Sequence, residues 1–385
     1  MRILQAHNSY RFPGGEDRVV ADEARLLRSY GHQVERFEVK NSADLLEAAK
    51  ALSLSIWNPA SLVRLERTIR EFKADVLHVH NTWFSLSPSV LSNRDVPTQL
   101  TLHNYRTVCA NAQLFRNGNV CELCVDGSTF NAVRYGCYRD RLASIPAAAT
   151  VGVHRRLGTW RRLPDHVLVL TDFAKKYAVA AGFPEERISV HSNFVFDPGP
   201  IGTPPAASDY ICFVGRLDVS KGIEVLAQAW QQAPPSLRLV VVGSGPMEHL
   251  IEKLPRTKVT GWIPAAEVTQ ILGNSRAFVL PSLWYEGQPI ALLEALALRR
   301  PVIASNHGGI GETAAGLGPD SLVSPGSVAE LANAIERLIS DDEVAKRGAK
   351  SRDLYELKHS PHVAFGSLSK AYHRTIELFG QRVRT

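Results

Sequence analysis

The chain has 385 residues, 45% of them hydrophobic and 21% charged, with a formal net charge of +6. This length exceeds one ordinary hydrophobic core and suits two domains of about 190 residues, which excludes a small single-core module and a largely disordered chain. No run reaches the ~18 apolar residues of a membrane-spanning helix, and the first residues lack a signal-peptide pattern, so we expect a cytoplasmic protein.

Apolar strands alternate with helices in the first half of the chain. The sequence predicts a strand at 2–7, a glycine-containing loop, and an amphipathic helix that ends near Tyr30. Further strands are expected at 76–79, 98–102, 167–170 and 188–191. Continuous apolar strands separated by helices indicate a parallel sheet covered on both faces, so residues 1–195 form a doubly wound α/β domain.

Two features of this half lie where such a sheet builds binding sites. Gly14 and Gly15 precede a helix and permit close backbone approach to a ligand, although a tight turn explains them almost as well. His103 follows the strand at 98–102, and ligands bind outside the carboxyl ends of the strands in this architecture. Three other histidines lie on or beside strands and rank lower: His7, His78 and His80.

Four of the five cysteines lie in one irregular stretch, residues 105–140, while Cys212 falls in an apolar strand. They are spaced as Cys109-x11-Cys121-x2-Cys124-x12-Cys137. A Cys-x2-Cys pair with two flanking cysteines resembles a four-thiolate structural zinc site, although the flanking spacings are not those of a standard finger. Separate reduced thiols are the alternative, and disulfides are disfavoured in a cytosolic protein.

The positive charge belongs to the first half, where residues 1–195 carry 25 Lys and Arg against 19 Asp and Glu. Residues 134–162 hold seven Arg and one acid, together with an apolar run and Trp160. Such a segment can lie on an anionic membrane surface, which would place the protein at the inner face of the cell membrane; a solvated helix face is the alternative. No nucleic-acid-binding module accompanies it, so nucleic acid is not expected as a partner.

A stretch rich in Pro and Gly, 196–208, predicts a linker. Beyond it, strands are expected at 210–214, 237–242, 277–280 and 301–304, again separated by helices. Residues 209–364 therefore form a second doubly wound domain. A terminal helix is expected in 365–385.

Two loops of this second domain carry candidate chemistry. Arg216 and Lys221 share a strand-to-helix loop, and both cations can reach a diphosphate there unless they are merely solvated. Seven residues separate Glu286 from Glu294, and Pro289 suits the first turn of a helix, so the first Glu lies on a loop and the second inside a helix. The N-terminus of that helix would offer an anion site beside the loop.

These motifs resemble the family-4, group 1 retaining glycosyltransferases. The resemblance covers most of residues 210–320. It rests on Glu286-x7-Glu294, on the run from Gly215 to Gly222, and on glycine loops near Gly243, Ile263 and Gly308. It implies the GT-B architecture, in which two Rossmann-like domains face each other across a cleft. The first domain would bind the acceptor, the second the donor, and the last helix would cross back to the first domain.

The resemblance also implies a donor, an acceptor and residue roles. A UDP- or GDP-sugar would be the donor and a glycan or lipid-linked molecule the acceptor, in assembly of a bacterial surface polysaccharide or glycolipid. Arg216 and Lys221 would stabilise the leaving diphosphate, Glu286 would hold sugar hydroxyls and Glu294 ribose hydroxyls. The expected catalytic residues are Glu286, His103, Arg216 and Lys221. The expected donor-binding residues are Gly14, Gly15, Arg216, Lys221, Gly243, Ile263, Glu286, Gly287, Gln288, Pro289, Ile290, Ala291 and Glu294.

Three details qualify this assignment. Many relatives carry a larger apolar residue where this chain has Gln288, which predicts a more polar wall near the donor sugar. No cofactor is expected for catalysis. Two other functions stay open: an epimerase of the same fold would convert nucleotide sugar without acceptor, and a non-catalytic nucleotide-sugar-binding protein would turn over nothing.

Overall fold

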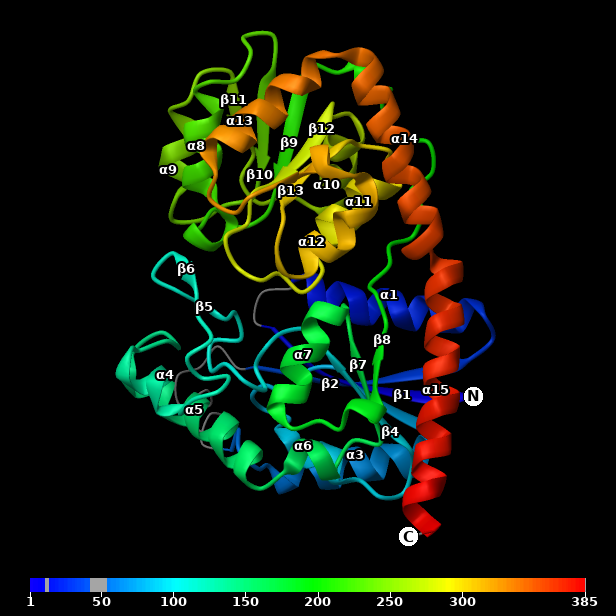
Figure 1. Ribbon diagram of the computed structural model, residues 1–385. Coiled ribbons are helices and arrows are strands. Elements are labelled where there is room, and N and C mark those ends of the chain that lie inside the picture. Colours follow the sequence, from blue (N-terminus) through cyan, green and yellow to red (C-terminus); the bar gives the residue numbers. More distant parts are fainter. Residues whose placement is uncertain (11–13, 42–53, 385) are drawn as a thin grey trace. The chain divides into compact units, whose positions relative to one another are not determined.

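A computed structural model describes residues 1–10, 14–41 and 54–384 (Figure 1). The chain separates into two compact units. The first comprises Met1–Leu114, Cys121–Ser192 and the C-terminal residues from Ala364, and the second comprises Phe115–Val120 and Asn193–Val363. Residues 196–208, expected as a linker, thus belong to the second unit, and the cysteine-rich stretch contributes a six-residue segment, 115–120, to that same unit.

The first unit is built on a parallel sheet with the strand order β2-β1-β3-β4-β7-β8. Its strands are β1 (Arg2–Ser9), β2 (Gln33–Lys40), β3 (Val76–Val79), β4 (Thr98–Leu102), β7 (His166–Val169) and β8 (Ile188–Val190). Strand β2 was not predicted, because this edge strand is half-exposed and carries charged residues among its apolar ones.

The helices of this unit are α1 (Gly15–Ser29), α3 (Pro59–Phe72), α4 (Phe130–Arg134), α5 (Arg141–Arg156), α6 (Thr159–Arg162), α7 (Asp172–Ala181) and α15 (Pro361–Arg384). The C-terminal helix α15 packs on this unit, where Leu368 and Tyr372 share a buried cluster with Ile3, Val76 and Leu168. Burying these side chains holds the last helix against three strands of the first sheet.

One sequence expectation about α5 and α6 is wrong. Trp160, assigned to a membrane-facing segment, is only 6% exposed and its ring lies 5.5 Å from that of Phe183. By contrast, Leu142 is 79% exposed and Ile145 50% exposed on α5. The apolar surface of α5 in this basic segment is therefore aliphatic, while Trp160 belongs to the core.

The second unit repeats the plan with the strand order β11-β10-β9-β12-β13-β14, again fully parallel. Its strands are β9 (Tyr210–Val214), β10 (Arg238–Val242), β11 (Thr257–Val259), β12 (Ala277–Leu280), β13 (Val302–Ser305) and β14 (Leu322–Val323). Its helices are α8 (Ile223–Trp230), α9 (Glu248–Glu252), α10 (Ala265–Gly273), α11 (Ile290–Ala297), α12 (Gly308–Ala314), α13 (Val328–Glu336) and α14 (Asp341–Lys358). A short antiparallel hairpin, β5 (Phe115–Arg116) and β6 (Asn119–Val120), also belongs here.

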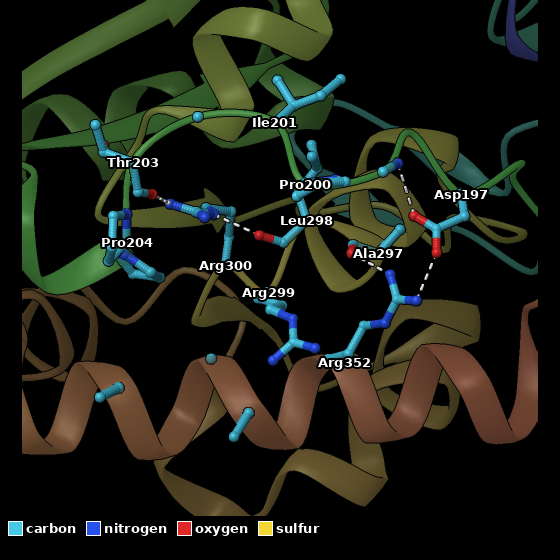
Figure 2. A pocket seen from close by; sticks show the side chains of 16 residues that line it. Asp197, Pro200, Ile201, Thr203, Pro204, Ala297, Leu298, Arg299, Arg300 and Arg352 are labelled. Carbon is cyan, nitrogen blue, oxygen red and sulfur yellow. Dashed lines mark hydrogen bonds and ion pairs between the residues drawn. The ribbon is translucent and has the colours of Figure 1, made fainter.

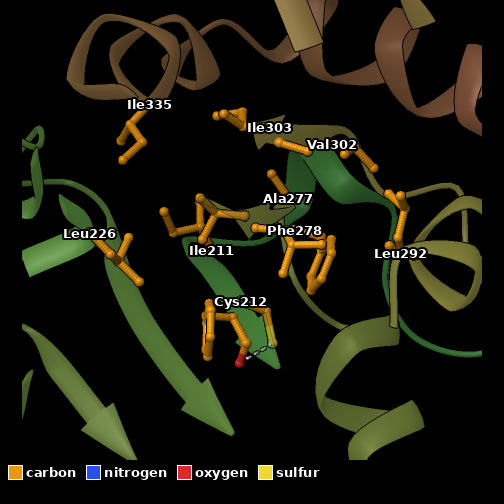
Figure 3. Close-up of a cluster of buried hydrophobic side chains, with 14 of the residues drawn as sticks. Ile211, Cys212, Leu226, Ala277, Phe278, Leu292, Val302, Ile303 and Ile335 are labelled. Atoms are coloured by element: carbon orange, nitrogen blue, oxygen red, sulfur yellow. Dashed lines mark hydrogen bonds between the residues drawn. The ribbon is translucent and has the colours of Figure 1, made fainter. Parts of the chain in front are cut away.

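The core of this unit lies around the two central strands (Figure 3). Ile211 of β9 and Phe278 of β12 are fully buried, as are Leu226 of α8 and Leu292 of α11. Figure 1 shows α8 and α13 on one side of this sheet and α10 and α11 on the other. The expected fold class, two doubly wound parallel-sheet domains, is confirmed.

Candidate active site

The second unit brings Lys221 and Glu286 together where its strand order reverses, between β9 and β12. Ligands bind at such switch points, outside the carboxyl ends of the strands. Lys221 ends a 3-10 turn, η4 (Val219–Lys221), and its N–H donates to Asp218 Oδ1 at 3.2 Å. Its Nζ lies 2.5 Å from Glu286 Oε1, with the two side chains 13% and 7% exposed. A nearly buried pair of opposite charges thus occupies the predicted position.

The loop that carries Glu286 is held by several hydrogen bonds. Ser282 Oγ donates to Glu286 Oε1 at 2.8 Å, and the N–H of Gly309 donates to the Glu286 carbonyl at 2.9 Å. A Cβ atom on Gly309 would lie 1.6 Å from the Gly287 carbonyl oxygen. Only glycine therefore permits α12 to approach this loop so closely.

Helix α11 begins directly after the loop. Pro289 is its N-cap. The N–H of Leu292 donates to the Pro289 carbonyl at 3.1 Å. Ile290 and Ala291 form the first turn, where N–H groups and the helix dipole favour an anion. Glu294 lies inside α11 and is 7% exposed. The expected loop and helix positions of the two carboxylates are confirmed.

The remaining candidates of this unit lie on neighbouring loops. The side chain of Arg216 is 61% exposed and its guanidinium lies 3.3 Å from Asp218 Oδ2, so it is held loosely. Gly243 has φ of 133°, and a Cβ atom there would lie 1.9 Å from the Gly215 carbonyl oxygen. The loops after β9 and β10 therefore touch through their backbones. Ile263 is half-buried.

Gln288, predicted to make the wall near the donor sugar more polar, is buried and hydrogen-bonded within the second unit. Its side chain is 7% exposed, and its Oε1 accepts from the N–H of Asn193 at 2.5 Å while its Nε2 donates to Thr313 Oγ1 at 3.1 Å. Asn193 Nδ2 in turn donates to the Gln288 carbonyl at 3.1 Å. The glutamine amide joins three segments of the second unit, which explains a polar residue at a buried position.

In the first unit, His103 ends a chain of buried polar side chains. Its Nε2 lies 3.1 Å from His80 Nδ1, and His80 Nε2 lies 3.5 Å from Glu23 Oε1. Glu23, on α1, also lies 3.0 Å from His78 Nδ1 and accepts from Gln5 Nε2 at 2.9 Å. The carboxyl ends of β3 and β4 thus place two stacked imidazoles against one carboxylate.

The charges in this chain follow from burial. Burial alone would raise the pKa of Glu23, but His78 and His80 hold it well below its usual range. Burial lowers the pKa of His80 to about 4, and burial and His80 hold the pKa of His103 well below its usual value. At neutral pH Glu23 is ionised and both imidazoles are neutral.

The Glu23 carboxylate, 3.5 Å from His80 Nε2, favours the His80 tautomer with its proton on Nε2, and in that tautomer Nδ1 accepts from His103 Nε2. His103 Nδ1 then carries a lone pair. His80 and His103 also line a cavity of about 60 Å³ together with Trp83, Leu102 and Arg106. A neutral imidazole acceptor at a cavity wall is suited to a substrate hydroxyl.

In the glycine loop of the first unit, Gly14 is hydrogen-bonded to Asp17. The N–H of Gly14 donates to Asp17 Oδ2 at 2.8 Å, and His7 Nε2 lies 2.9 Å from Asp17 Oδ1. Gly14 is the N-cap of α1 with φ of −127°, which any residue adopts, and among the described residues a Cβ atom there would meet Asp17 Oδ2 at 4.0 Å. Close approach of a ligand stays its predicted role.

Two other features are not active-site candidates. Glu23, His78 and His80 place three possible metal-ligand atoms within 4.8 Å of one another, but His78 already bonds Tyr372 and Thr101. A hollow of about 520 Å³ in the second unit is lined by residues of 197–205 and α14 (Figure 2). Its Arg352 binds Asp197 and its Arg300 binds the backbone carbonyls of 203, 275 and 298. These two guanidinium groups are occupied by protein oxygens.

Comparison with known families covers most of the chain. Residues 13–196 match the family described as Glycosyltransferase Family 4, and residues 208–341 match Glycosyl transferases group 1. This chain belongs to glycosyltransferase family 4. The first match covers most of the first sheet and the second match covers the second sheet, so each half of the fold resembles a glycosyltransferase domain.

Named relatives of this family-4 chain match parts of it. TuaC of Bacillus subtilis, a glycosyltransferase assigned to teichuronic acid biosynthesis, is 37% identical over 42% of this chain and 40% of its own length. The 2-deoxystreptamine glucosyltransferase of Streptomyces kanamyceticus is 26% identical over 74% of this chain and 73% of its own. The match to TuaC thus spans about two fifths of that protein.

Solved glycosyltransferase structures share the fold. Sucrose-phosphate synthase of Thermosynechococcus elongatus aligns with a TM-score of 0.72 at 18% identity over 97% of this chain and 98% of its own. HepE of Anabaena in complex with UDP aligns with a TM-score of 0.66 at 18% identity, over 97% of this chain and 100% of its own. Within the described residues of this family-4 chain, no helix has the length and apolarity needed to cross a membrane.

Ser282 and Glu23 were not predicted from the sequence. Ser282 supports Glu286, and Glu23 lies 3.5 Å from His80, which contacts His103. His80 was named from the sequence only as a lower-ranked candidate, just after the strand that carries His78. No sequence signal marks Glu23, because it lies on an amphipathic helix where a charged residue is ordinary.

Proposed function

We propose that this family-4 protein transfers a sugar from a UDP-sugar to a hydroxyl of a glycan or lipid-linked acceptor, with retention of anomeric configuration. The observation that carries the proposal is the Lys221–Glu286 pair at the switch point of the second sheet, 2.5 Å apart and nearly buried beside the N-terminus of α11. Uridine is preferred over guanosine because HepE, of the same fold, is solved with UDP and with UDP-glucose. Relatives assigned to teichuronic and colanic acid biosynthesis favour a surface polysaccharide or glycolipid product.

Electrostatics supply most of the proposed chemistry. As the bond from the sugar to the diphosphate breaks, negative charge grows on the leaving phosphate, and the Lys221 ammonium together with the α11 N–H groups stabilises it. Arg216, exposed and loosely held, adds a second cation. Glu286 receives donor-sugar hydroxyls, and the leaving oxygen takes the proton of the acceptor hydroxyl. No cofactor is needed for this step.

His103 positions a substrate hydroxyl in this proposal. Its Nδ1 lone pair accepts the hydroxyl hydrogen, and Glu23 maintains that tautomer through His80. Glu23 and His80 are positioning residues, since they act through His103.

Nucleotide titration tests the donor assignment. We expect UDP to bind in calorimetry more tightly than GDP or ADP. Glu294→Ala should weaken UDP by ~10- to 100-fold, because hydrogen bonds to a charged group contribute about 1.5–3 kcal/mol. Glu252→Ala, which changes an exposed glutamate at the end of α9, is the matched control and should bind as the wild type does. Binding of none of the nucleotides would favour a non-catalytic protein, and equal UDP affinity in Glu294→Ala would remove its ribose role.

A lipid-linked acceptor would bring the first unit to the membrane. We propose that α5 contacts anionic lipid through Leu142 and Ile145, which are 79% and 50% exposed beside the exposed Arg141. The double variant Leu142→Glu with Ile145→Glu should lower sedimentation with phosphatidylglycerol vesicles by roughly tenfold or more. Leu357→Glu changes a 70% exposed leucine of α14 and serves as control. Equal sedimentation of both variants and the wild type would refute this surface.

A further inference from the structure

Two tryptophans line the cavity beside His103, and each carries a buried N–H group without a partner. Trp83 and Trp160 are each only 6% exposed, and both belong to the wall of this cavity of about 60 Å³ in the first unit. Within the described residues, neither indole Nε1 has a hydrogen-bond acceptor. The buried Nε of Arg106, another residue of the wall, has none either. Buried donors are nearly always paired in folded proteins, so we expect a ligand to supply the acceptor.

The unpaired groups of this wall are all donors. Indole and guanidinium N–H groups donate and cannot accept. Other polar residues of the wall already have partners within the protein. Asn81 Nδ2 donates to the Asn8 carbonyl at 2.8 Å, Asn81 Oδ1 accepts from the N–H of Trp83 at 2.9 Å, and Thr150 Oγ1 donates to the Pro146 carbonyl at 2.9 Å. A ligand in the cavity must therefore present an acceptor oxygen to these donors.

The rest of the cavity restricts the size and polarity of that ligand. Leu91, Leu100 and Val151 form an apolar part of the wall and are almost fully buried. A water molecule needs at least ~10–15 Å³ of such a cavity, so the space holds about four atoms of that size. A whole sugar ring is too large for it. A side group with about four non-hydrogen atoms, one of them an acceptor oxygen and one of them apolar, fits.

We propose that this cavity binds the acetamido group of an N-acetylated acceptor sugar. An acetamido group has four non-hydrogen atoms: the nitrogen, the carbonyl carbon, the oxygen and the methyl carbon. Its oxygen has two lone pairs for the indole N–H groups of Trp83 and Trp160, and its methyl group packs against Leu91, Leu100 and Val151. A carboxylate would also accept from these donors, but it has no apolar part, and burying its charge is costly.

The half-buried residues of the wall connect this cavity to the proposed transfer site. His103, Asn104 and Arg106 are half-buried, so the cavity meets the surface on the side of His103. An acetamido group bound inside would hold the neighbouring hydroxyl of the same sugar ring beside His103 Nδ1. This placement of a reacting hydroxyl rests on the proposed function, whereas binding of the N-acetylated sugar by itself does not.

NMR of the indole N–H groups tests the cavity without any nucleotide. Protein labelled with ¹⁵N at its six tryptophans should give six indole signals, and Trp83→Phe and Trp160→Phe assign two of them. The methyl glycoside of N-acetylglucosamine or of N-acetylgalactosamine should move both signals to lower field, and methyl glucoside should move neither. Signals that no sugar moves would mean that water alone fills the cavity. That result, or a shift with methyl glucuronide only, would overturn the proposal.

Affinity measurements separate the indole contacts from the general fold. Trp83→Phe keeps an aromatic ring but loses the N–H, so it should weaken binding of the N-acetylated sugar by roughly threefold to tenfold. Trp57→Phe changes a 42% exposed tryptophan of the same unit and is the matched control. Equal weakening in both variants, or none in Trp83→Phe, would contradict the indole contact.

An acyl series on the wild-type protein keeps the test decisive if Trp83→Phe fails to fold. The N-butanoyl sugar should bind at least ~10-fold more weakly than the N-acetyl sugar, because the cavity has no room for two further carbons. Equal affinity for the two sugars would overturn the proposal.

Transfer assays distinguish this proposal from the proposed function. With a UDP-sugar, an N-acetylated acceptor should react with a kcat/KM at least ~10-fold above that of its hydroxyl counterpart. Transfer without this preference would contradict the acetamido site and leave the transferase activity standing. Binding of the N-acetylated sugar without any transfer would contradict only the proposed transferase function.

Discussion

Replacing Lys221 by Met should lower kcat for sugar transfer by ~10²- to 10³-fold, the range seen when one preorganised donor to a developing charge is removed. Methionine preserves the length and apolar stem of lysine but has no charge. The lysine ammonium lies 2.5 Å from Glu286 Oε1 and its side chain is only 13% exposed, so water cannot replace it well. The effect should therefore appear in turnover and only weakly in the KM for acceptor.

Glu286→Gln tests whether Glu286 and Lys221 act on the same donor, and Lys253→Met is the matched control. Glu286→Gln should lower kcat similarly, and the double variant should lose less than the product of the two single effects, because the residues act on one donor. Arg216→Ala should depress turnover more than Glu294→Ala does. Lys253→Met, at the exposed end of α9, should leave kcat unchanged. A kcat within about threefold of wild type in Lys221→Met would contradict the electrostatic role.

Adding one methyl group at Gly309 should slow sugar transfer strongly by displacing the Glu286 loop. The new Cβ atom would lie 1.6 Å from the Gly287 carbonyl oxygen and 2.7 Å from that of Glu286, so the loop must move. Displacing a catalytic group by ~1 Å can cost about 10²-fold in rate. We therefore expect kcat of Gly309→Ala to fall by ~10²-fold, measured together with the thermal midpoint.

The control for that substitution is Gly366→Ala in α15. A Cβ atom at Gly366 meets nothing within 4 Å, so alanine should be tolerated and should stabilise the helix by about 0.5–1 kcal/mol. Full activity in Gly309→Ala would show that the Glu286 loop can move without consequence. Aggregation of Gly309→Ala would instead assign the glycine to folding.

The sequence predicts the second site better than the first, for physical reasons. Lys221 and Glu286 lie on loops after apolar strands, and parallel strands bring such loops to one edge of a sheet. Their direct ion pair was not predictable, because the two residues are 65 positions apart in the sequence and only the strand order makes them neighbours. The Glu23–His80–His103 chain needs the register of β3 and β4 as well as the position of α1, and none of these is encoded locally.

The sequence-based predictions were weakest where the exposure of a residue differs from what its type suggests. Trp160 looked amphipathic in a run of arginines, yet its ring packs into the first unit. The partners of the Gln288 amide, Asn193 and Thr313, were likewise not predictable from its residue type. The edge strand β2 was missed because exposed strands carry charge. In all three cases the placement depends on tertiary contacts. Sequence periodicity indicates which side of an element faces solvent, but it does not identify these contacts.

Acceptor-dependent transfer tests the central claim most directly. Purified protein would be given a panel of UDP-sugars with and without lipid-linked and glycan acceptors. Released UDP would be measured, and the anomeric configuration of the product would be read by NMR. The account predicts that UDP is released only with an acceptor and that the product has the anomeric configuration of the donor. In Lys221→Met, both the released UDP and the product should be lost. Conversion of a UDP-sugar without acceptor, or an inverted product, would contradict it.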